Sequence, residues 1–208
     1  MHLRSNKILI FVFAAVWLSL TGAGLRILLS YESSPGDAGN PPKKWPVASR
    51  IERASGMPVL VMMAHPHCPC TRASIGELAM LMARVQGKVN AYVLFYKPSG
   101  SADGWEKTDL WKSAAAIPGV TVLSDVDGGE AHRFNIETSG HTLLFDPEGR
   151  QVFSGGITGS RGHSGDNEGR SAIVSLLTTG APSRDNTFVF GCSLFDPNRQ
   201  KETTLCSK

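Results

Sequence analysis

The stretch Pro58-Val-Leu-Val-Met-Met-Ala-His-Pro-His-Cys-Pro-Cys70 decides the fold, because it joins an uninterrupted apolar run to two closely spaced cysteines. The run at 58–64 is short enough for one strand, and its lack of polar alternation predicts a strand buried on both faces. Apolar residues then recur at helical spacing: Ile75, Leu78, Met82 and Val85. The cysteines are therefore predicted to lie between a buried strand and the start of a helix.

A cysteine at that place is predicted to be reactive. The first turn of a helix offers free N–H groups and a partial positive charge. Both favour a thiolate over a thiol, so they lower the cysteine pKa. His65, His67 and Arg72 are expected to add positive charge beside Cys68 and Cys70. The pattern indicates redox or metal-binding thiols rather than inert core cysteines.

The rest of the chain alternates strand and helix patterns. We expect strands at 89–96, 120–123, 141–145 and 151–154, and helical segments at 75–87, 108–116, 130–134 and 173–179. The turn at 146–149 joins the last two strands. Ser164 or Asp166 is expected to cap the last helix, which Gly180 ends. This order predicts an α/β domain with a mixed sheet and helices on both faces.

The N-terminal segment predicts a membrane location. Arg4 and Lys7 precede an apolar run at 8–29, which is close to the ~20 residues that span a bilayer. A signal peptide cut near Ala23 is the alternative. The positive-inside rule then predicts a single-pass protein of a bacterial inner membrane, with its C-terminal domain in the periplasm. The net charge of +3 comes with scattered basic residues, which gives no indication of nucleic-acid binding.

Several motifs resemble the thioredoxin superfamily. They are the strand at 59–63, Cys68-Pro69 at the strand-to-helix turn, Ser124-Asp-Val-Asp-Gly128, and Thr142-Leu-Leu-Phe-Asp146 with Gly149. They look most like the tethered periplasmic branch of TlpA-like and peroxiredoxin-like proteins. The run Cys-Pro-Cys-Thr-Arg-Ala-Ser and the glycine-rich segment at 154–167 resemble bacterial RedB-like proteins. The resemblance implies a thioredoxin-like fold and exchange with a protein thiol or disulfide client, without a cofactor.

The chain departs from the superfamily pattern at two places. The cysteines are spaced Cys-x-Cys, so Thr71 takes the usual resolving position, and a Cys68–Cys70 disulfide would close a small, strained and easily reduced ring. His141 takes the place of the superfamily's cis-proline, before the strand that faces the cysteines. A histidine there can bind a metal, whereas a proline cannot.

Two functions from different classes follow. The first is a thiol–disulfide oxidoreductase in which Cys68 attacks, Cys70 is its partner, and the residues His65, His67 and Arg72 favour the thiolate. The alternative is a copper-binding assembly factor resembling the Sco family, with Cys68, Cys70 and His141 as ligands, since thiolate and imidazole suit Cu(I). A thiol peroxidase ranks third, because the threonine it needs should precede the reactive cysteine.

The C-terminal third leaves several roles open. The loop at 155–169 lacks the Gly-Lys-Ser/Thr ending of a phosphate loop. It is a surface loop or a flap in which Arg161 or His163 touches a substrate. Cys192 is predicted to form a structural bridge to Cys206, or else to act as a third redox thiol or a metal ligand. The predicted parts are an anchor at 1–30, a Pro/Gly-rich linker at 31–55, the thioredoxin-like domain at 56–181 and a tail at 182–208.

Overall fold

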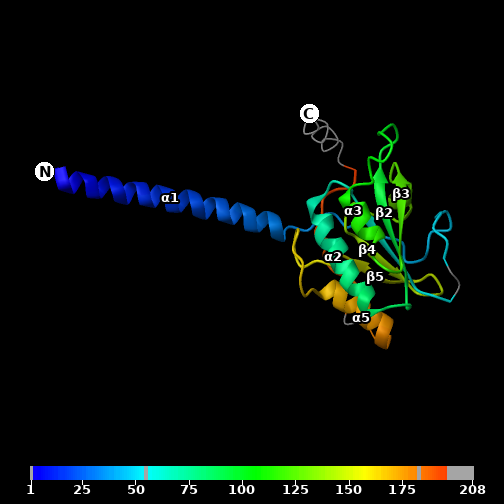
Figure 1. Cartoon of the computed structure of the whole chain (residues 1–208). Helices are drawn as coiled ribbons and strands as arrows, with labels where there is room; N and C mark the ends of the chain where they lie inside the picture. Colours follow the sequence, from blue (N-terminus) through cyan, green and yellow to red (C-terminus); the bar gives the residue numbers. More distant parts are fainter. Residues whose placement is uncertain (1, 54–55, 182–183, 196–208) are drawn as a thin grey trace. The chain divides into compact units, whose positions relative to one another are not determined.

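The protein was analysed as a computed structural model that describes residues 2–53, 56–181 and 184–195. The chain divides into two units, Met1–Ser34 and Pro35–Lys208. The first unit is the helix α1 (His2–Ser33; Figure 1). Its segment Lys7–Ser33 contains an 18-residue window with a mean hydropathy of 2.2 and is long enough to cross a membrane, a property that signal sequences share.

The second unit contains a five-stranded mixed sheet with the strand order β3-β2-β1-β4-β5 (Figure 1). The strands are β1 (Val59–Ala64), β2 (Asn90–Lys97), β3 (Val120–Val126), β4 (Thr142–Phe145) and β5 (Gln151–Gly155). β1, β2 and β3 run parallel, whereas β4 is antiparallel to β1 and to β5. Every residue of the central strand β1 is buried, as its uninterrupted apolar run predicts.

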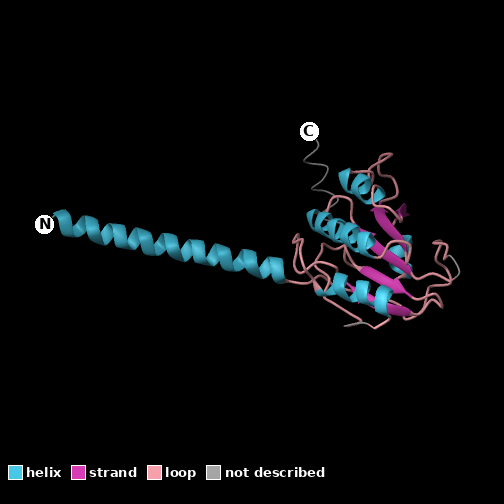
Figure 2. Ribbon diagram, turned by 60° about the horizontal axis from the view of Figure 1, so that its bottom comes forward, coloured by secondary structure: helices cyan, strands magenta, loops and turns pink. Residues whose placement is uncertain are grey.

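Helices cover both faces of this sheet (Figure 2). The helices α2 (Pro69–Arg84), α3 (Asp109–Ala115) and α5 (Glu168–Thr179) pack on one face, where the larger core cluster lies. The short helix α4 (Gly129–Arg133) and an aromatic cluster pack on the other face. This architecture is a thioredoxin-like fold, which confirms the predicted fold class.

The segment before β1 lies against the domain. The ring centroid of Trp45 is 5.2 Å from that of Phe134 and 5.1 Å from that of Phe145, in edge-on geometry. The Ser49 hydroxyl donates a hydrogen bond to Glu130 at 2.7 Å. From Pro35 on, the expected linker at 31–55 therefore belongs to the same compact unit as the domain, because burying the large Trp45 ring offsets the cost of ordering the chain.

The last helix begins at a different cap from the expected one. The N-cap of α5 is Asn167, whose side chain accepts a hydrogen bond from the Arg170 N–H at 2.8 Å. The prediction of Ser164 or Asp166 was wrong, and the Asp166 carboxylate instead pairs with the Arg170 guanidinium at 2.8 Å. The helix ends at Gly180 in the left-handed conformation, as predicted.

Candidate functional site: a cluster of three thiols

The first two thiols lie at the start of α2. Cys68 is the N-cap residue with an extended backbone, and Pro69 fills the first helical position, where its fixed φ and missing N–H cost nothing. Ser139 fixes this loop from the other side, because its hydroxyl accepts the His65 N–H at 2.8 Å and hydrogen-bonds the Thr71 hydroxyl at 2.7 Å. The loop is therefore held at both ends, by the helix and by the segment that precedes β4.

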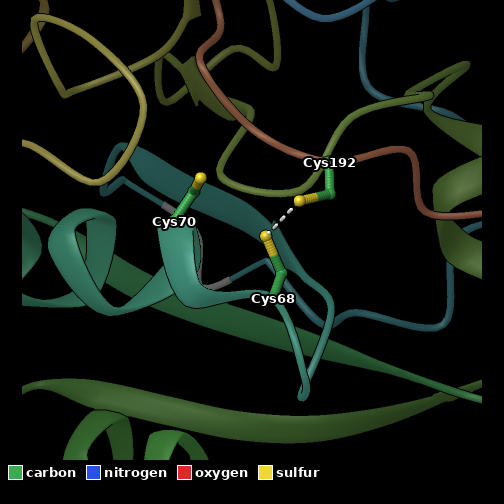
Figure 3. Close-up of side chains that lie close together, drawn as sticks. All are labelled: Cys68, Cys70 and Cys192. Atoms are coloured by element: carbon green, nitrogen blue, oxygen red, sulfur yellow. Dashed lines mark hydrogen bonds between the residues drawn. The ribbon is translucent and has the colours of Figure 1, made fainter. Parts of the chain in front are cut away.

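Cys192 completes the site from the far end of the sequence. Its Sγ lies 2.9 Å from the Cys68 Sγ (Figure 3). The Sγ atoms of Cys68, Cys70 and Cys192 all lie within 4.8 Å of one another, and all three residues are buried. The sequence predicted three alternative roles for Cys192. It could not place this thiol beside Cys68, because it shows only a cysteine in an alternating apolar run. Its expected partner Cys206 lies outside the described residues.

The pKa values of Cys68 and Cys70 are shifted in opposite directions. The pKa of Cys68 is lowered well below its usual range, because the thiols of Cys192 and Cys70 donate hydrogen bonds to its thiolate and Thr71 adds two more. The pKa of Cys70 is raised, because its bonds to Cys192 and Cys68 and its burial favour the neutral thiol. One negative charge is therefore held on Cys68, as expected for a thiolate at a helix N-terminus.

The three residues expected to add positive charge beside the cysteines, His65, His67 and Arg72, contact other side chains. The His65 ring is buried and lies against Tyr96, with ring centroids 5.9 Å apart. The His67 ring packs on Trp105 with ring centroids 4.6 Å apart, and the backbone N–H of His67 donates to the His65 Nδ1 at 3.2 Å. Arg72 pairs with Asp109 at 2.5 Å on the surface. These contacts make the two histidines part of an aromatic wall beside the loop, and their tuning of Cys68 stays a prediction.

His141 is fully buried but lies outside the three-sulfur group. Its Nε2 hydrogen-bonds the Ser154 hydroxyl at 2.9 Å. Burial lowers the pKa of His141 to about 4, so the ring is neutral at pH 7. Its backbone pairs with β1, since the Met63 N–H donates to the His141 carbonyl at 3.0 Å. All peptide bonds of the described residues are trans, which includes the position compared with a cis-proline.

The glycine-rich loop at 155–169 reaches the tail. The Arg161 guanidinium donates a hydrogen bond to the carbonyl of Gly191, the residue before Cys192. His163 is exposed. Of the two residues expected in a flap, Arg161 therefore contacts the segment that carries the third thiol.

Comparisons with known proteins support the fold. No family model and no curated protein matches the sequence. A structure of an uncharacterized protein from Geobacillus kaustophilus is similar, with a TM-score of 0.57, 17% identity, and coverage of 79% of this chain and 94% of that one. A hypothetical protein from Sinorhizobium meliloti gives a TM-score of 0.57, 15% identity, and coverage of 78% and 96%. At these identities the likeness shows the fold alone.

A further similarity is to a secreted disulfide oxidoreductase of Mycobacterium tuberculosis. Its TM-score is 0.42 at 15% identity, with coverage of 60% of this chain and 83% of that one. A score this low carries no argument about the chemistry of the present chain.

Proposed function

We propose that this protein is a thiol–disulfide oxidoreductase in which Cys68 is the attacking thiol. One observation carries the proposal: the N-cap residue of a helix is a cysteine whose thiol has a lowered pKa and lies 2.9 Å from another thiol. A thiolate is the nucleophile in disulfide exchange, and a second thiol within reach is what resolves the product. No cofactor is needed for this chemistry.

Disulfide exchange then starts from an ionised Cys68 and a neutral Cys70. The Cys68 thiolate attacks one sulfur of a client disulfide, and the other client sulfur leaves as a thiolate that takes up a proton. Cys70 stays a neutral thiol because its pKa is raised, so it stabilises the ionised form of Cys68 by hydrogen bonding.

The test is reduction of insulin by the full-length protein in mild detergent, with dithiothreitol as electron donor. We expect Cys68→Ser to abolish the activity above the dithiothreitol background. Ser193→Ala is a matched control, since this residue adjoins Cys192 and, within the described part of the chain, its hydroxyl accepts a single hydrogen bond, from the Phe195 N–H. Wild-type protein without activity, or Cys68→Ser with full activity, would overturn the proposal.

A second candidate is a soft-metal site, which the grouping of three buried sulfurs favours. The spacing of the Cys68 and Cys192 sulfurs lies about midway between the metal-bound and the disulfide distances. Two thiolates bound to one metal at about 2.3 Å in tetrahedral geometry lie about 3.8 Å apart, whereas the Cys68 and Cys192 sulfurs are 2.9 Å apart. Metal binding would require these two sulfurs to separate, and disulfide formation would require them to approach.

Anaerobic Cu(I) titration of the reduced protein separates the two candidates. If a metal site exists, the ligand prediction for Cys68, Cys70 and His141 requires one-to-one binding that weakens sharply in His141→Ala. A three-sulfur site instead loses affinity in Cys192→Ser and not in His141→Ala. Absence of specific binding, together with exchange that requires Cys68, would remove the metal candidate.

We also propose that α1 anchors the chain in a bacterial inner membrane, with the second unit in the periplasm, as in tethered TlpA-like and RedB-like proteins. The support is the apolar segment Lys7–Ser33 and the basic residues Arg4 and Lys7 before the apolar run. Fractionation should find the uncut chain in the membrane, open to protease from the periplasmic side. A soluble product beginning near Leu25 would contradict the anchor.

A further inference from the structure

We propose that Cys192 is the resolving thiol of this site, and that the tail segment at 187–194 (here called the tail strand), which joins the domain through an isolated β-bridge at Ser193, brings it to Cys68. The inference rests on the proposed exchange function and deepens it. It assigns to a tail cysteine the role that a Cys-x-x-Cys motif would give to its second cysteine.

The tail pairs with the segment before β4 as an added strand would. The Ser139 N–H donates to the Cys192 carbonyl at 2.8 Å, and the Leu194 N–H donates to the Glu137 carbonyl at 2.8 Å. Between them, Thr138 and Ser193 form an antiparallel bridge. Two regularly spaced bonds on either side of a bridge fix the register, so the backbone itself sets the position of the Cys192 side chain.

The same segment is held along its length by other parts of the domain. The Gly36 N–H donates to the Val189 carbonyl at 2.8 Å, and the Gly156 N–H donates to the Phe188 carbonyl at 3.2 Å. Val189 and Leu194 are both buried. The segment is thus a built part of the fold, and Cys192 reaches Cys68 through a fixed backbone.

Gly191 shows how closely this strand approaches the site. A Cβ at Gly191 would lie 1.9 Å from the Ser139 carbonyl oxygen, which is a backbone atom that cannot move aside cheaply. Only glycine permits this approach. The close contact places the next residue, Cys192, directly over the start of α2.

Ring size disfavours Cys70 as the resolving thiol. A disulfide needs the two Cβ atoms within about 4.5 Å and correctly aimed, and a Cys68–Cys70 bond, with one residue between the cysteines, would close a small and strained ring. Figure 3 shows the sulfurs of Cys68 and Cys192 pointing toward one another, 2.9 Å apart. Oxidation of this pair requires a small approach of the two sulfurs.

The resolving step balances as follows. After the first attack, Cys68 is joined to the client in a mixed disulfide. The Cys192 thiol loses its proton and attacks the Cys68 sulfur, forming a Cys68–Cys192 disulfide, and the client sulfur leaves and takes up a proton. The client disulfide has gained two electrons and the protein dithiol has lost two. A dithiol reductant then restores the protein.

Tryptic digestion under non-reducing conditions gives a direct test. The sequence places Cys68 and Cys70 in one peptide (54–72), Cys192 in a second (185–199) and Cys206 in a third (202–208). After reaction of reduced protein with one equivalent of a model disulfide peptide, we expect 54–72 joined to 185–199. The link should persist in Cys70→Ser and vanish in Cys68→Ser. A bond within 54–72, or between 185–199 and 202–208, would overturn the assignment.

Trapping the mixed disulfide tests the order of steps. Cys192→Ser should accumulate the Cys68–client adduct at least tenfold over wild type, whereas Cys70→Ser should not. Ser193→Ala is the matched control, and a thermal unfolding curve for each variant checks that it is folded. Accumulation in Cys70→Ser but not in Cys192→Ser would overturn the inference while leaving Cys68 exchange intact. No adduct in any variant, with no insulin reduction, would instead remove the proposed function.

Discussion

Helix α2 carries two buried polar clusters of opposite character. At its start, the thiols of Cys68 and Cys70 meet the thiol of Cys192. About two turns further on, the Glu77 carboxylate pairs with the Arg170 guanidinium, and both side chains are only 1% exposed. The Gly165 N–H and the Asn167 amide also donate to Glu77, at 2.7 and 3.1 Å.

The ionic cluster and the thiol cluster are held by different interactions and have different roles. Buried ions must keep their partners, because an uncompensated charge in the core costs several kcal/mol. The Glu77 cluster therefore fixes α2, α5 and the glycine-rich loop in one arrangement. The thiol cluster instead holds one charge, on Cys68, through hydrogen bonds from Cys192, Cys70 and Thr71, and that charge disappears when a disulfide forms. A site that alternates between dithiol and disulfide therefore cannot depend on a permanent ion pair, and the neighbouring Glu77 cluster supplies the rigidity.

The largest expected effect lies in the ionic cluster. Glu77→Ala removes the buried ionic partner of Arg170 and leaves the guanidinium paired with the exposed Asp166, so we expect a loss of about 3 kcal/mol in the free energy of unfolding. Urea denaturation in mild detergent measures it. Cys68→Ser, as control, should lose less than half as much. An equal loss in both variants would show that the thiols are as structural as the ion pair.

Burial of the neutral His141 ring should make the stability of the protein depend on pH. The pKa of this ring falls from 6.5 to about 4 on burial, so the unfolded chain binds more protons than the folded one between these values. Stability is therefore full above pH 6.5 and falls with pH down to about 4, by about 3 kcal/mol at 1.36 kcal/mol per unit. His141→Asn should remove this slope from the urea-denaturation profile. An unchanged slope would assign it to other groups.

The tail strand is tested by Gly191→Ala, because the added methyl group meets the Ser139 carbonyl. We expect a loss of about 1–3 kcal/mol from overpacking, and faster alkylation of Cys68 as the strand leaves its place. Gly159→Ala is the matched control, since a Cβ there meets nothing within 4 Å. Alkylation at the wild-type rate in Gly191→Ala would mean that the strand does not cover the thiols.

The smallest expected change concerns charge rather than stability. Hydrogen bonds from Cys192 are the foremost cause of the low Cys68 pKa, so Cys192→Ala should raise that pKa while Cys70 still donates. The ultraviolet absorbance of the thiolate, followed through a pH titration, should disappear at a higher pH in this variant than in wild type. Coincident titrations would show that the helix terminus alone, and not the third thiol, holds the charge on Cys68.

Local patterns predicted much of the fold. The apolar run before Cys68, the helical spacing after it and the turn at 146–149 all appear as expected. β3 is longer than predicted, extending to Val126, because pairing with β2 continues through polar residues that show no strand pattern. The cap of α5 shifted to Asn167, since Asp166 was drawn into an ion pair with Arg170. Such choices depend on partners that sequence spacing does not reveal.

The sequence by itself determined the reactive end of α2: a buried strand, a proline at the first helical position and two cysteines follow from local propensity and period. Only the tertiary structure decided that Cys192, 124 residues away, meets Cys68, and that His141 turns to Ser154. The physical reason is that these contacts come from backbone pairing between distant segments. That pairing depends on which edges the folded sheet leaves open, and no local pattern encodes it.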